Sequence, residues 1–301
     1  MKKMLFIRNE KAFLPEIEAY IRYFNKTKEF IAYDSSKLNG DFDQNEYDIL
    51  WEFKGVGGLK ATDQILIHEY ASLSTGTFPV LKNTIKTLKN RKPNLRVFLN
   101  ANVKSGFNFK DTIPYCYRDM GIDRIFLQNK TQKKEFDFVY IGSVSKCREI
   151  DQLLHTFTTK MKGKLLLIGP ADDDLYTAYK DNKDITFTGK VRYNEVPQIA
   201  STAEYGVNFI PDRYPFNIQT STKLLEYLAL GLKVITTDYE WVRQFEQKNN
   251  CSFFKLNINH FDHSQLEKHE FISNLNREYY LWDNVIDRSN ILQKIIELGK
   301  P

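Results

Sequence analysis

A polar loop that runs into an apolar segment carries the clearest chemistry in the sequence. Residues 220–223 read Thr-Ser-Thr-Lys, and an apolar run follows at once. Either Ser221 or Thr222 is suited to cap a helix that begins there. The first turn of such a helix offers backbone N–H groups, the positive end of the helix dipole and the Lys223 ammonium, which together favour an anion. One turn later, Glu226 could accept hydrogen bonds from a ribose diol, so the pattern suits a nucleoside diphosphate.

Two series of apolar runs alternate with helical patterns along the chain. Near-continuous apolar strands separated by helices indicate parallel sheets that are covered on both faces. The expected strands are 3–8, 29–33, 48–53, 64–68, 95–100, 124–127, 136–141, 164–168, 185–188, 205–209 and 233–236. The expected helices are 13–24, 79–89, 150–157, 174–179, 195–200 and 223–229.

The two series predict two domains. The polar, charged segment 128–135 lies between them and has the composition of a linker. We therefore predict an α/β protein with two Rossmann-like, doubly wound parallel-sheet domains, at residues 1–130 and 136–285. A final helix at about 286–301 is expected to pack back on the first domain.

Loops after the strands of the second series are the expected ligand sites, because open parallel sheets bind ligands beyond the carboxyl ends of their strands. Gly142 and Gly169 each follow a strand, and glycine lets a backbone approach a ligand closely. Ser143 adds a hydroxyl and Arg148 adds a charge. A single glycine after a strand usually serves only the geometry of a turn. The prediction of a ligand site therefore depends on several such loops at one edge of the sheet.

The composition limits the class of protein. The chain has 301 residues, 42% of them hydrophobic, and no run of 18 apolar residues that would predict a transmembrane helix. Its three cysteines lack CxxC spacing, which argues against a disulfide framework or a zinc site and fits a reducing cytoplasm. The first 136 residues hold 23 Lys+Arg against 16 Asp+Glu. Such a basic surface either meets phosphorylated substrates, anionic membrane or nucleic acid, or only faces solvent.

The order of the motifs resembles the nucleotide-sugar half of glycosyltransferases with the GT-B fold, most similar to family 4. The resemblance covers about residues 137–298 and rests on their order and spacing. The segments that carry it are Tyr140-Ile141-Gly142-Ser143, Leu166-Leu167-Ile168-Gly169, Ile185-Thr186-Phe187-Thr188-Gly189-Lys190-Val191, Val196-Pro197 with Ala203-Glu204-Tyr205-Gly206-Val207, the run from Lys223 to Thr237, and Tyr280-Leu281-Trp282-Asp283-Asn284-Val285. It implies a GT-B architecture, with the acceptor bound by the first domain.

The resemblance also implies roles for individual residues. Glu226 occupies the position of the glutamate that holds the ribose. Arg148 replaces a phosphate-binding lysine, and His68 stands where many relatives have an active-site histidine. The expected catalytic residues are therefore His68, Arg148 and Lys223. The expected donor-binding residues are Gly142, Ser143, Gly169, Val191, Arg192, Ser221, Thr222, Lys223, Leu224 and Glu226, with Val191 and Arg192 at the base.

Two positions depart from the family pattern. Ile218 stands where the family often has a glutamate, which leaves open how the sugar hydroxyls are held. Ser143 stands in place of a phosphate-binding arginine, so Arg148 and Lys223 are left as the main cations for the diphosphate.

Acceptor residues are expected in the first domain. Gly57 and Gly58 lie in a glycine-rich loop that is either a plain flexible loop or an acceptor contact, and Glu69 neighbours His68. His68 itself has a second interpretation as a partly exposed structural residue at a strand end. The helix 79–92 carries an apolar stripe beside a lysine stripe, which is typical both of a membrane-surface helix and of a core-facing helix with a solvated lysine face.

The leading prediction is a glycosyltransferase that moves a sugar from a nucleoside diphosphate sugar, with UDP expected, to a glycan or lipid-linked acceptor. It would retain the anomeric configuration, use no cofactor or metal, build surface polysaccharide in the cytoplasm, and could touch an anionic membrane. The alternatives are a nucleotide-sugar epimerase of the same architecture and a nucleic-acid-binding protein. Two Asp-x-Asp triplets, 41–43 and 172–174, could hold a metal–diphosphate, but capping or plain surface positions are the simpler interpretation.

Overall fold

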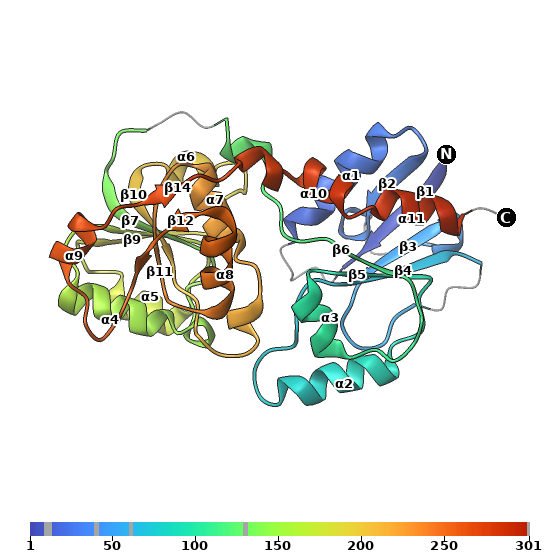
Figure 1. Cartoon of the computed structure of the whole chain (residues 1–301), viewed down its shortest axis with the longest axis horizontal. Coiled ribbons are helices and arrows are strands. Elements are labelled where there is room, and N and C mark those ends of the chain that lie inside the picture. Colours follow the sequence, from blue (N-terminus) through green and yellow to red (C-terminus); the bar gives the residue numbers. More distant parts are fainter. Residues whose placement is uncertain (9–13, 39–41, 60–62, 129–131, 300–301) are drawn as a thin grey trace. The chain divides into compact units, whose positions relative to one another are not determined.

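The computed structural model describes residues 1–8, 14–38, 42–59, 63–128 and 132–299. They form two compact units, the first made of residues 1–121 and 279–301 and the second of residues 122–278. Each unit is built on its own six-stranded sheet, and the strands within each are parallel (Figure 1). The prediction of an α/β protein with two parallel sheets is therefore confirmed.

The first sheet has the strand order β2-β1-β3-β4-β5-β6. Its strands are β1 (Lys2–Ile7), β2 (Phe30–Asp34), β3 (Ile49–Phe53), β4 (Ile65–Tyr70), β5 (Leu95–Phe98) and β6 (Tyr115–Tyr117). The helices of this unit are α1 (Pro15–Lys26), α2 (Pro79–Lys89), α3 (Ala101–Phe107), α10 (Trp282–Arg288) and α11 (Ile291–Leu298).

One core joins both ends of the chain to the first sheet. Tyr20 and Phe24 of α1 pack with Trp51 of β3, and the chain's last helices add Trp282 and Ile295 to the same cluster. The rings of Tyr20 and Trp51 have centroids 4.6 Å apart. Burial of such large aromatic side chains supplies much of a core's hydrophobic stabilisation.

The sixth strand of this unit lies elsewhere than the sequence predicted. Residues 124–127 were expected to be a strand, but Arg124–Phe126 form a short 3₁₀ turn that begins where the Asp123 carboxylate accepts a hydrogen bond from the Ile125 N–H at 3.2 Å. The strand at the sheet edge is β6, whose two tyrosines are exposed on either side of buried Cys116. A three-residue strand with exposed ends has too little apolar pattern to stand out in a sequence.

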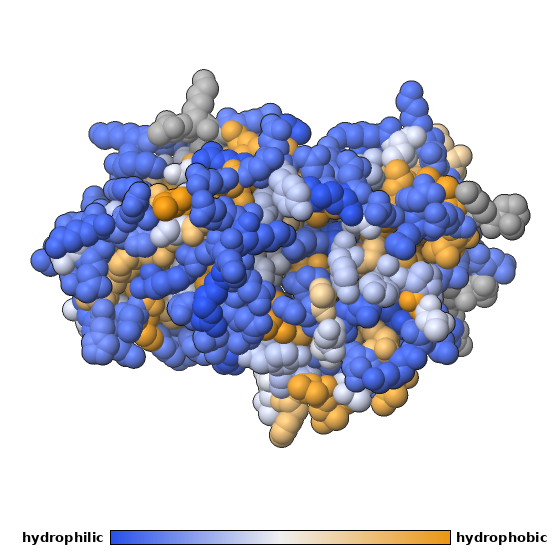
Figure 2. Space-filling view, in the orientation of Figure 1, coloured by the Kyte–Doolittle hydropathy of each residue, from blue (hydrophilic) through white to orange (hydrophobic). Residues whose placement is uncertain are grey.

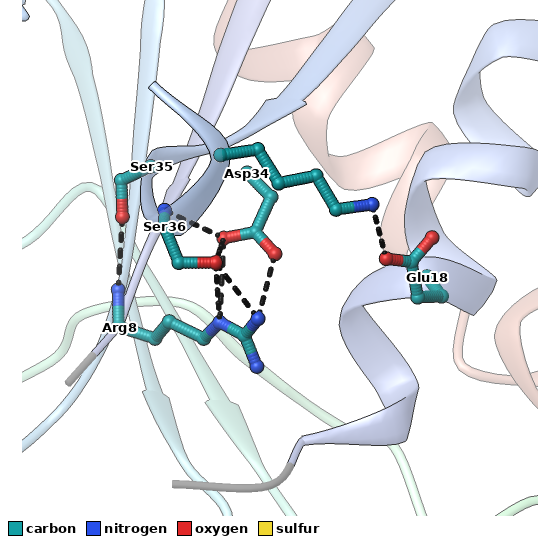
Figure 3. A network of polar contacts seen from close by, with 6 residues as sticks. Arg8, Glu18, Asp34, Ser35 and Ser36 are labelled. Atoms are coloured by element: carbon teal, nitrogen blue, oxygen red, sulfur yellow. Dashed lines mark hydrogen bonds and ion pairs between the residues drawn. The ribbon is translucent and has the colours of Figure 1, made fainter. Parts of the chain in front are cut away.

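Polar contacts hold the carboxyl ends of β1 and β2 together (Figure 3). The Arg8 guanidinium lies 2.9 Å from the Asp34 carboxylate and also donates to the Ser36 hydroxyl at 2.8 Å. Lys37 pairs with Glu18 of α1 at 2.5 Å. These contacts tie the turn after β2 to the neighbouring strand and helix.

The second sheet has the order β13-β11-β10-β7-β8-β9. Its strands are β7 (Phe136–Ile141), β8 (Leu165–Ile168), β9 (Ile185–Gly189), β10 (Ala203–Asn208), β11 (Lys233–Thr236) and β13 (Phe254–Lys255), and β12 (Cys251–Ser252) pairs separately with β14 (Ile272–Ser273). The helices are α4 (Ile150–Lys160), α5 (Asp173–Tyr179), α6 (Val196–Ala200), α7 (Thr222–Ala229), α8 (Glu240–Asn249) and α9 (His263–Lys268).

The order of these strands brings the polar loops of the second unit to one edge. Strands β10, β7, β8 and β9 are consecutive neighbours, so the loops that follow them share the carboxyl edge of the sheet. Below that edge, Phe138, Leu153 and Val207 are buried in one apolar cluster. The loops therefore stand on a packed base that fixes their positions.

Candidate donor site

The start of α7 is anchored by a buried polar network. The Ser221 hydroxyl accepts a hydrogen bond from the Leu224 N–H at 3.4 Å and donates to the Asn208 side-chain carbonyl at 2.7 Å. The Asn208 amide in turn donates to the hydroxyls of Thr236 at 2.9 Å and Tyr239 at 3.0 Å. Ser221 is thus the helix cap, as one of the two predicted candidates, and the network fixes the direction in which the first turn points.

Lys223 is a buried cation inside that first turn. Its side chain is almost inaccessible, and its Nζ has no hydrogen-bond partner among the described residues. The ammonium lies 4.1 Å from the centre of the Tyr140 ring. Burial, and then the charge of Arg148, hold the pKa of Lys223 well below its usual value, while Glu226 acts in the opposite sense. A buried ammonium without an anionic hydrogen-bond partner is prepared to receive an anion.

Glu226 lies one helical turn further on and is 4% exposed. Its carboxylate accepts a hydrogen bond from the Tyr193 hydroxyl at 3.0 Å. Burial raises the pKa of Glu226 to about 7, against the smaller opposing effects of Tyr193 and Lys223. The side chain is therefore held in one place and is easily protonated near neutral pH.

Tyr193 is a site residue that the sequence did not predict. It follows Val191 and Arg192, which were expected at the base, and its ring also packs against Phe126 with centroids 5.5 Å apart. Its contact with Glu226 joins the loop after β9 to α7 across 33 positions of sequence. Only the position directly after the predicted base-binding pair could have hinted at it.

The glycines of the strand-end loops lie against one another. Gly142 has φ +133° and Gly169 has φ +139°, and a Cβ on Gly169 would collide with the Gly142 carbonyl oxygen. The Gly169 N–H donates to the Gly189 carbonyl at 3.0 Å. A Cβ on Gly142 would come within 3.8 Å of the Lys223 ammonium. The loops after three strands and the start of α7 therefore meet, as the sequence predicted from their common edge.

The remaining donor-site candidates lie around this meeting point. Arg148 is half-buried in the turn before α4 and close enough to Lys223 to affect its pKa. The Ser143 carbonyl accepts a hydrogen bond from the Tyr140 hydroxyl at 3.3 Å. Val191 is half-buried, whereas Arg192 is exposed and its N–H donates to Glu195 at 3.2 Å.

The two Asp-x-Asp triplets have local partners. Asp172 accepts a hydrogen bond from the Lys146 N–H at 3.0 Å, and the exposed Asp174 pairs with the Lys146 ammonium. Asp43 accepts from the Asn45 N–H at 2.9 Å, and Asp41 lies outside the described residues. Among the residues that the structure describes, no three His, Cys, Asp or Glu side chains gather as a metal-binding group.

His68 lies inside a strand of the first unit. The sequence predicted that the strand ends at residue 68, but β4 continues to Tyr70, and His68 is completely buried. Its Nε2 lies 3.2 Å from the Glu52 carboxylate, which Lys54 approaches at 3.3 Å. Burial lowers the pKa of His68; for Glu52, the His68 and Lys54 contacts outweigh burial and lower the carboxyl pKa.

Glu69 points to the opposite face of β4, because successive strand residues alternate. There it pairs with buried Arg118 and accepts a hydrogen bond from the Trp51 indole at 2.9 Å. Burial raises the pKa of Glu69. The predicted acceptor residue Glu69 and the predicted catalytic residue His68 are therefore not brought together, and both are enclosed.

The glycine-rich loop after β3 is held from two sides. The Gly57 carbonyl accepts a hydrogen bond from Lys54 at 2.5 Å, and the Gly57 N–H donates to the Asn90 side chain at 2.9 Å. Gly58, at φ +136°, lies against the Lys54–Glu52 pair. Hydrogen bonds therefore hold the loop in place. It lies against the Lys54–Glu52 ion pair, whose carboxylate contacts His68.

Comparison with known proteins agrees with this fold. Residues 135–258 match the family described as glycosyl transferases group 1. A search of curated proteins gave no match. Among solved structures, sucrose-phosphate synthase from Thermosynechococcus elongatus has a TM-score of 0.64 at 10% identity, covering 99% of this chain and 98% of its own. HepE from Anabaena, solved with UDP and glucose, has a TM-score of 0.62 at 12% identity, covering 99% of each chain.

A third neighbour comes from another class of enzyme. A structure described as that of a UDP-N-acetylglucosamine 2-epimerase from Listeria monocytogenes has a TM-score of 0.57 at 9% identity, covering 99% of this chain and 97% of its own. Identities this low establish the fold alone. These neighbours show that the chain has the GT-B fold, and residues 135–258, which lie almost wholly in the second unit, match the group 1 glycosyltransferases.

Proposed function

We propose that the chain transfers a sugar from a UDP-sugar and that the second unit holds the donor. The single observation that carries this is that Lys223, a buried cation, and Glu226, a buried carboxylate, lie one turn apart at the capped start of α7. The helix start and Lys223 would bind the diphosphate, with Ser221, Thr222 and Leu224 shaping the turn. Glu226 would accept hydrogen bonds from the ribose.

The other donor contacts come from the strand-end loops. Gly142 and Gly169 would let the backbone approach the diphosphate, with Ser143 beside them. Val191 and Arg192 would meet the base, and Tyr193 would hold Glu226 in place. These assignments are supported by the meeting of the loops at one edge.

Electrostatic stabilisation of the leaving diphosphate is the proposed catalytic step. Lys223 and Arg148 carry the charge that would stabilise UDP as the sugar–phosphate bond breaks, and fixed groups do this without reorganisation. Retention of configuration and independence from metal and cofactor follow from the family resemblance and belong to the proposal. His68 is left outside the reacting groups because it is completely buried beside Glu52.

The acceptor is proposed to be a glycan or lipid-linked sugar bound by the first unit, in surface polysaccharide synthesis at the cytoplasmic face of the membrane. The loop containing Gly57 and Gly58 supports this, since it closes the carboxyl end of β3, where parallel sheets bind ligands. Among the described residues no helix has the length and apolarity to cross a bilayer.

A nucleotide-sugar epimerase is the second candidate, favoured by the Listeria neighbour of the same fold. It would use the same donor site but return the sugar with one inverted carbon. A nucleic-acid-binding protein remains the non-enzymatic alternative, and salt-sensitive binding to random single strands would favour it.

The deciding experiment measures nucleoside diphosphate release from a panel of nucleotide sugars, with thermal stabilisation read beside it. Wild type is compared with Glu226→Ala and with Glu267→Ala, a control that removes an exposed glutamate of the same unit. We expect release from one donor, weakened about 10–100-fold in the first variant because hydrogen bonds to a charged group are lost, and unchanged in the control. The identity of the sugar product distinguishes transfer or hydrolysis from epimerisation, because an epimerase would return the sugar with one inverted carbon. No release and no stabilisation by any nucleotide would overturn the donor site.

A further inference from the structure

A cavity of about 480 Å³ opens in the first unit. It is lined by Val56 from the loop after β3, by residues 72–75 from the loop after β4, and by Lys82, Ile85 and Lys86 of α2. It therefore stands at the carboxyl edge of the first sheet, the edge at which parallel sheets bind ligands. None of the proposed donor-site residues lines it.

The lining of the cavity includes a buried hydroxyl without a partner. Ser74 is 8% exposed, and its hydroxyl has no hydrogen-bond partner among the described residues. Its N–H donates to the side-chain carbonyl of Asn83 at 3.0 Å. Asn83 itself does not line the cavity, and its amide nitrogen is also buried without a partner in the described chain. Buried groups of this kind are normally satisfied, so the unpartnered Ser74 hydroxyl indicates a ligand with acceptor oxygens.

The wall of the cavity is cationic. Lys82 donates to the Thr75 carbonyl at 3.0 Å, which places its ammonium beside the Ser74 loop. Burial, and then the charge of Lys82, lower the pKa of Lys86, and no carboxylate is among the lining residues. An anion between the two ammonium groups would offset both their repulsion and their desolvation.

An apolar stripe borders the cationic wall. Leu81 is 57% exposed and Leu88 is 79% exposed, and helical spacing places them on one face with Ile85, which lines the cavity. The core-facing position of α2 belongs instead to Asn83, so the apolar stripe is turned outward, contrary to the core-facing alternative. Figure 2 shows apolar side chains gathered over α2. Exposed apolar residues in such a group mark a binding surface.

We propose that this cavity binds the phosphate of a phosphorylated lipid, and that the lipid chain lies along the stripe of Leu81, Ile85 and Leu88. A phosphate supplies the acceptor oxygens that Ser74 lacks and the charge that Lys82 and Lys86 require. The neighbouring stripe then requires that the phosphate be carried on a hydrocarbon. That this lipid is the sugar acceptor rests on the proposed function; the binding itself does not.

The test uses the full chain and vesicles of phosphatidylcholine containing phosphatidic acid, whose terminal phosphate is the probe. Lys86→Met is compared with Lys89→Met, which removes an exposed lysine of the same helix that does not line the cavity. Loss of general attraction costs about fivefold in vesicle affinity for either lysine. Loss of a phosphate contact costs about 10–100-fold. We therefore expect a much larger loss in the first variant, and equal losses would overturn the proposal.

The head group gives a second measurement. Vesicles containing phosphatidylserine, adjusted to the same surface charge, lack a terminal phosphate. Wild type should bind them at least about tenfold more weakly than phosphatidic acid vesicles, and Lys86→Met should remove that preference. Equal binding of the two vesicles by wild type would contradict a phosphate site.

Substitutions on the apolar stripe test whether the hydrocarbon of the lipid contributes to binding. Leu88→Ser should weaken vesicle binding about tenfold or more, because the exposed leucine no longer enters the bilayer boundary. Val80→Ser, an exposed position of α2 off the stripe, should change it little. Soluble pyrophosphate that stabilises the chain, without any binding to vesicles, would overturn the lipid as the source of the phosphate.

Thermal stabilisation by UDP, measured on the same variants, separates the two proposals. Vesicle binding lost in Lys86→Met with UDP stabilisation intact assigns the effect to this cavity. A chain that binds the vesicles but no nucleotide would refute the donor site and support the lipid-phosphate cavity alone.

Discussion

Replacing Glu226 with glutamine is expected to stabilise the protein above neutral pH while it weakens nucleotide binding. Burial raises the pKa of this carboxyl from 4.5 in the unfolded chain to about 7 in the folded one. A raised carboxyl pKa means that stability is fully present below pH 4.5 and is lost as pH rises through 7. With these two values, the loss between pH 5 and pH 8 is about 2.5 kcal/mol.

The assay is urea unfolding of wild type and Glu226→Gln at pH 5 and pH 8. Glutamine keeps an acceptor for the Tyr193 hydroxyl but does not ionise, so the difference between the two proteins isolates the carboxyl. We expect the variant to gain about 2.5 kcal/mol relative to wild type on going from pH 5 to pH 8. Parallel pH curves for the two proteins would refute the argument that burial governs this group.

Nucleotide affinity should depend on the ionisation of the same carboxyl, but it should rise with pH where the stability falls. If the ribose binds the ionised carboxylate, about a tenth of the protein is competent at pH 6 and about nine-tenths at pH 8, given a pKa of about 7. UDP affinity of wild type should therefore rise roughly tenfold between these values. In Glu226→Gln that rise should vanish and affinity should stay low throughout.

Three further changes test the parts of the site separately. Ser221→Ala should cost about 1–3 kcal/mol of unfolding free energy in a denaturation experiment, since the helix cap and the Asn208 partner are both lost; a loss below about 0.5 kcal/mol would mean that the network adds nothing. Gly169→Ala should lower stability by at least about 1 kcal/mol, because φ is +139° and the new methyl meets the Gly142 carbonyl; wild-type stability would contradict this. Lys223→Met should weaken UDP binding about 10–100-fold in calorimetry while it stabilises the chain, because an unpartnered buried ammonium is removed; unchanged affinity would remove Lys223 from the diphosphate site.

The second unit could be predicted closely because its central strands, β7 and β8, are largely buried on both faces. Strand β7 has the predicted bounds 136–141, and the helix at 222 begins at a predicted cap. Continuous apolar runs and a serine cap are local signals that survive without tertiary information. The contact of Tyr193 with Glu226 is not local, and no spacing rule connects positions so far apart.

The first unit was predicted less well, for a physical reason. Its edge strand β6 is only three residues long, and its His68 is buried by strands that pair only in the fold. Residues 68 and 69 read as a polar strand end, yet each is enclosed by partners from distant segments. A sequence shows which residues are polar, but burial with a charged partner is a property of the fold.

Glu226 and Lys223 together indicate where the donor site obtains its affinity. Burial disfavours the charged form of each group. It therefore lowers the pKa of Lys223 and raises the pKa of Glu226. The folded chain therefore carries an electrostatic cost at the start of α7 that solvent cannot relieve. A ligand that presents hydroxyl donors to one group and an anion to the other would relieve both at once. A nucleoside diphosphate has these two parts at a separation set by its ribose, whereas an isolated phosphate would relieve only Lys223. Inorganic phosphate should consequently stabilise the chain far less than UDP, and uridine alone should do so only through Glu226 and the base contacts of Val191 and Arg192.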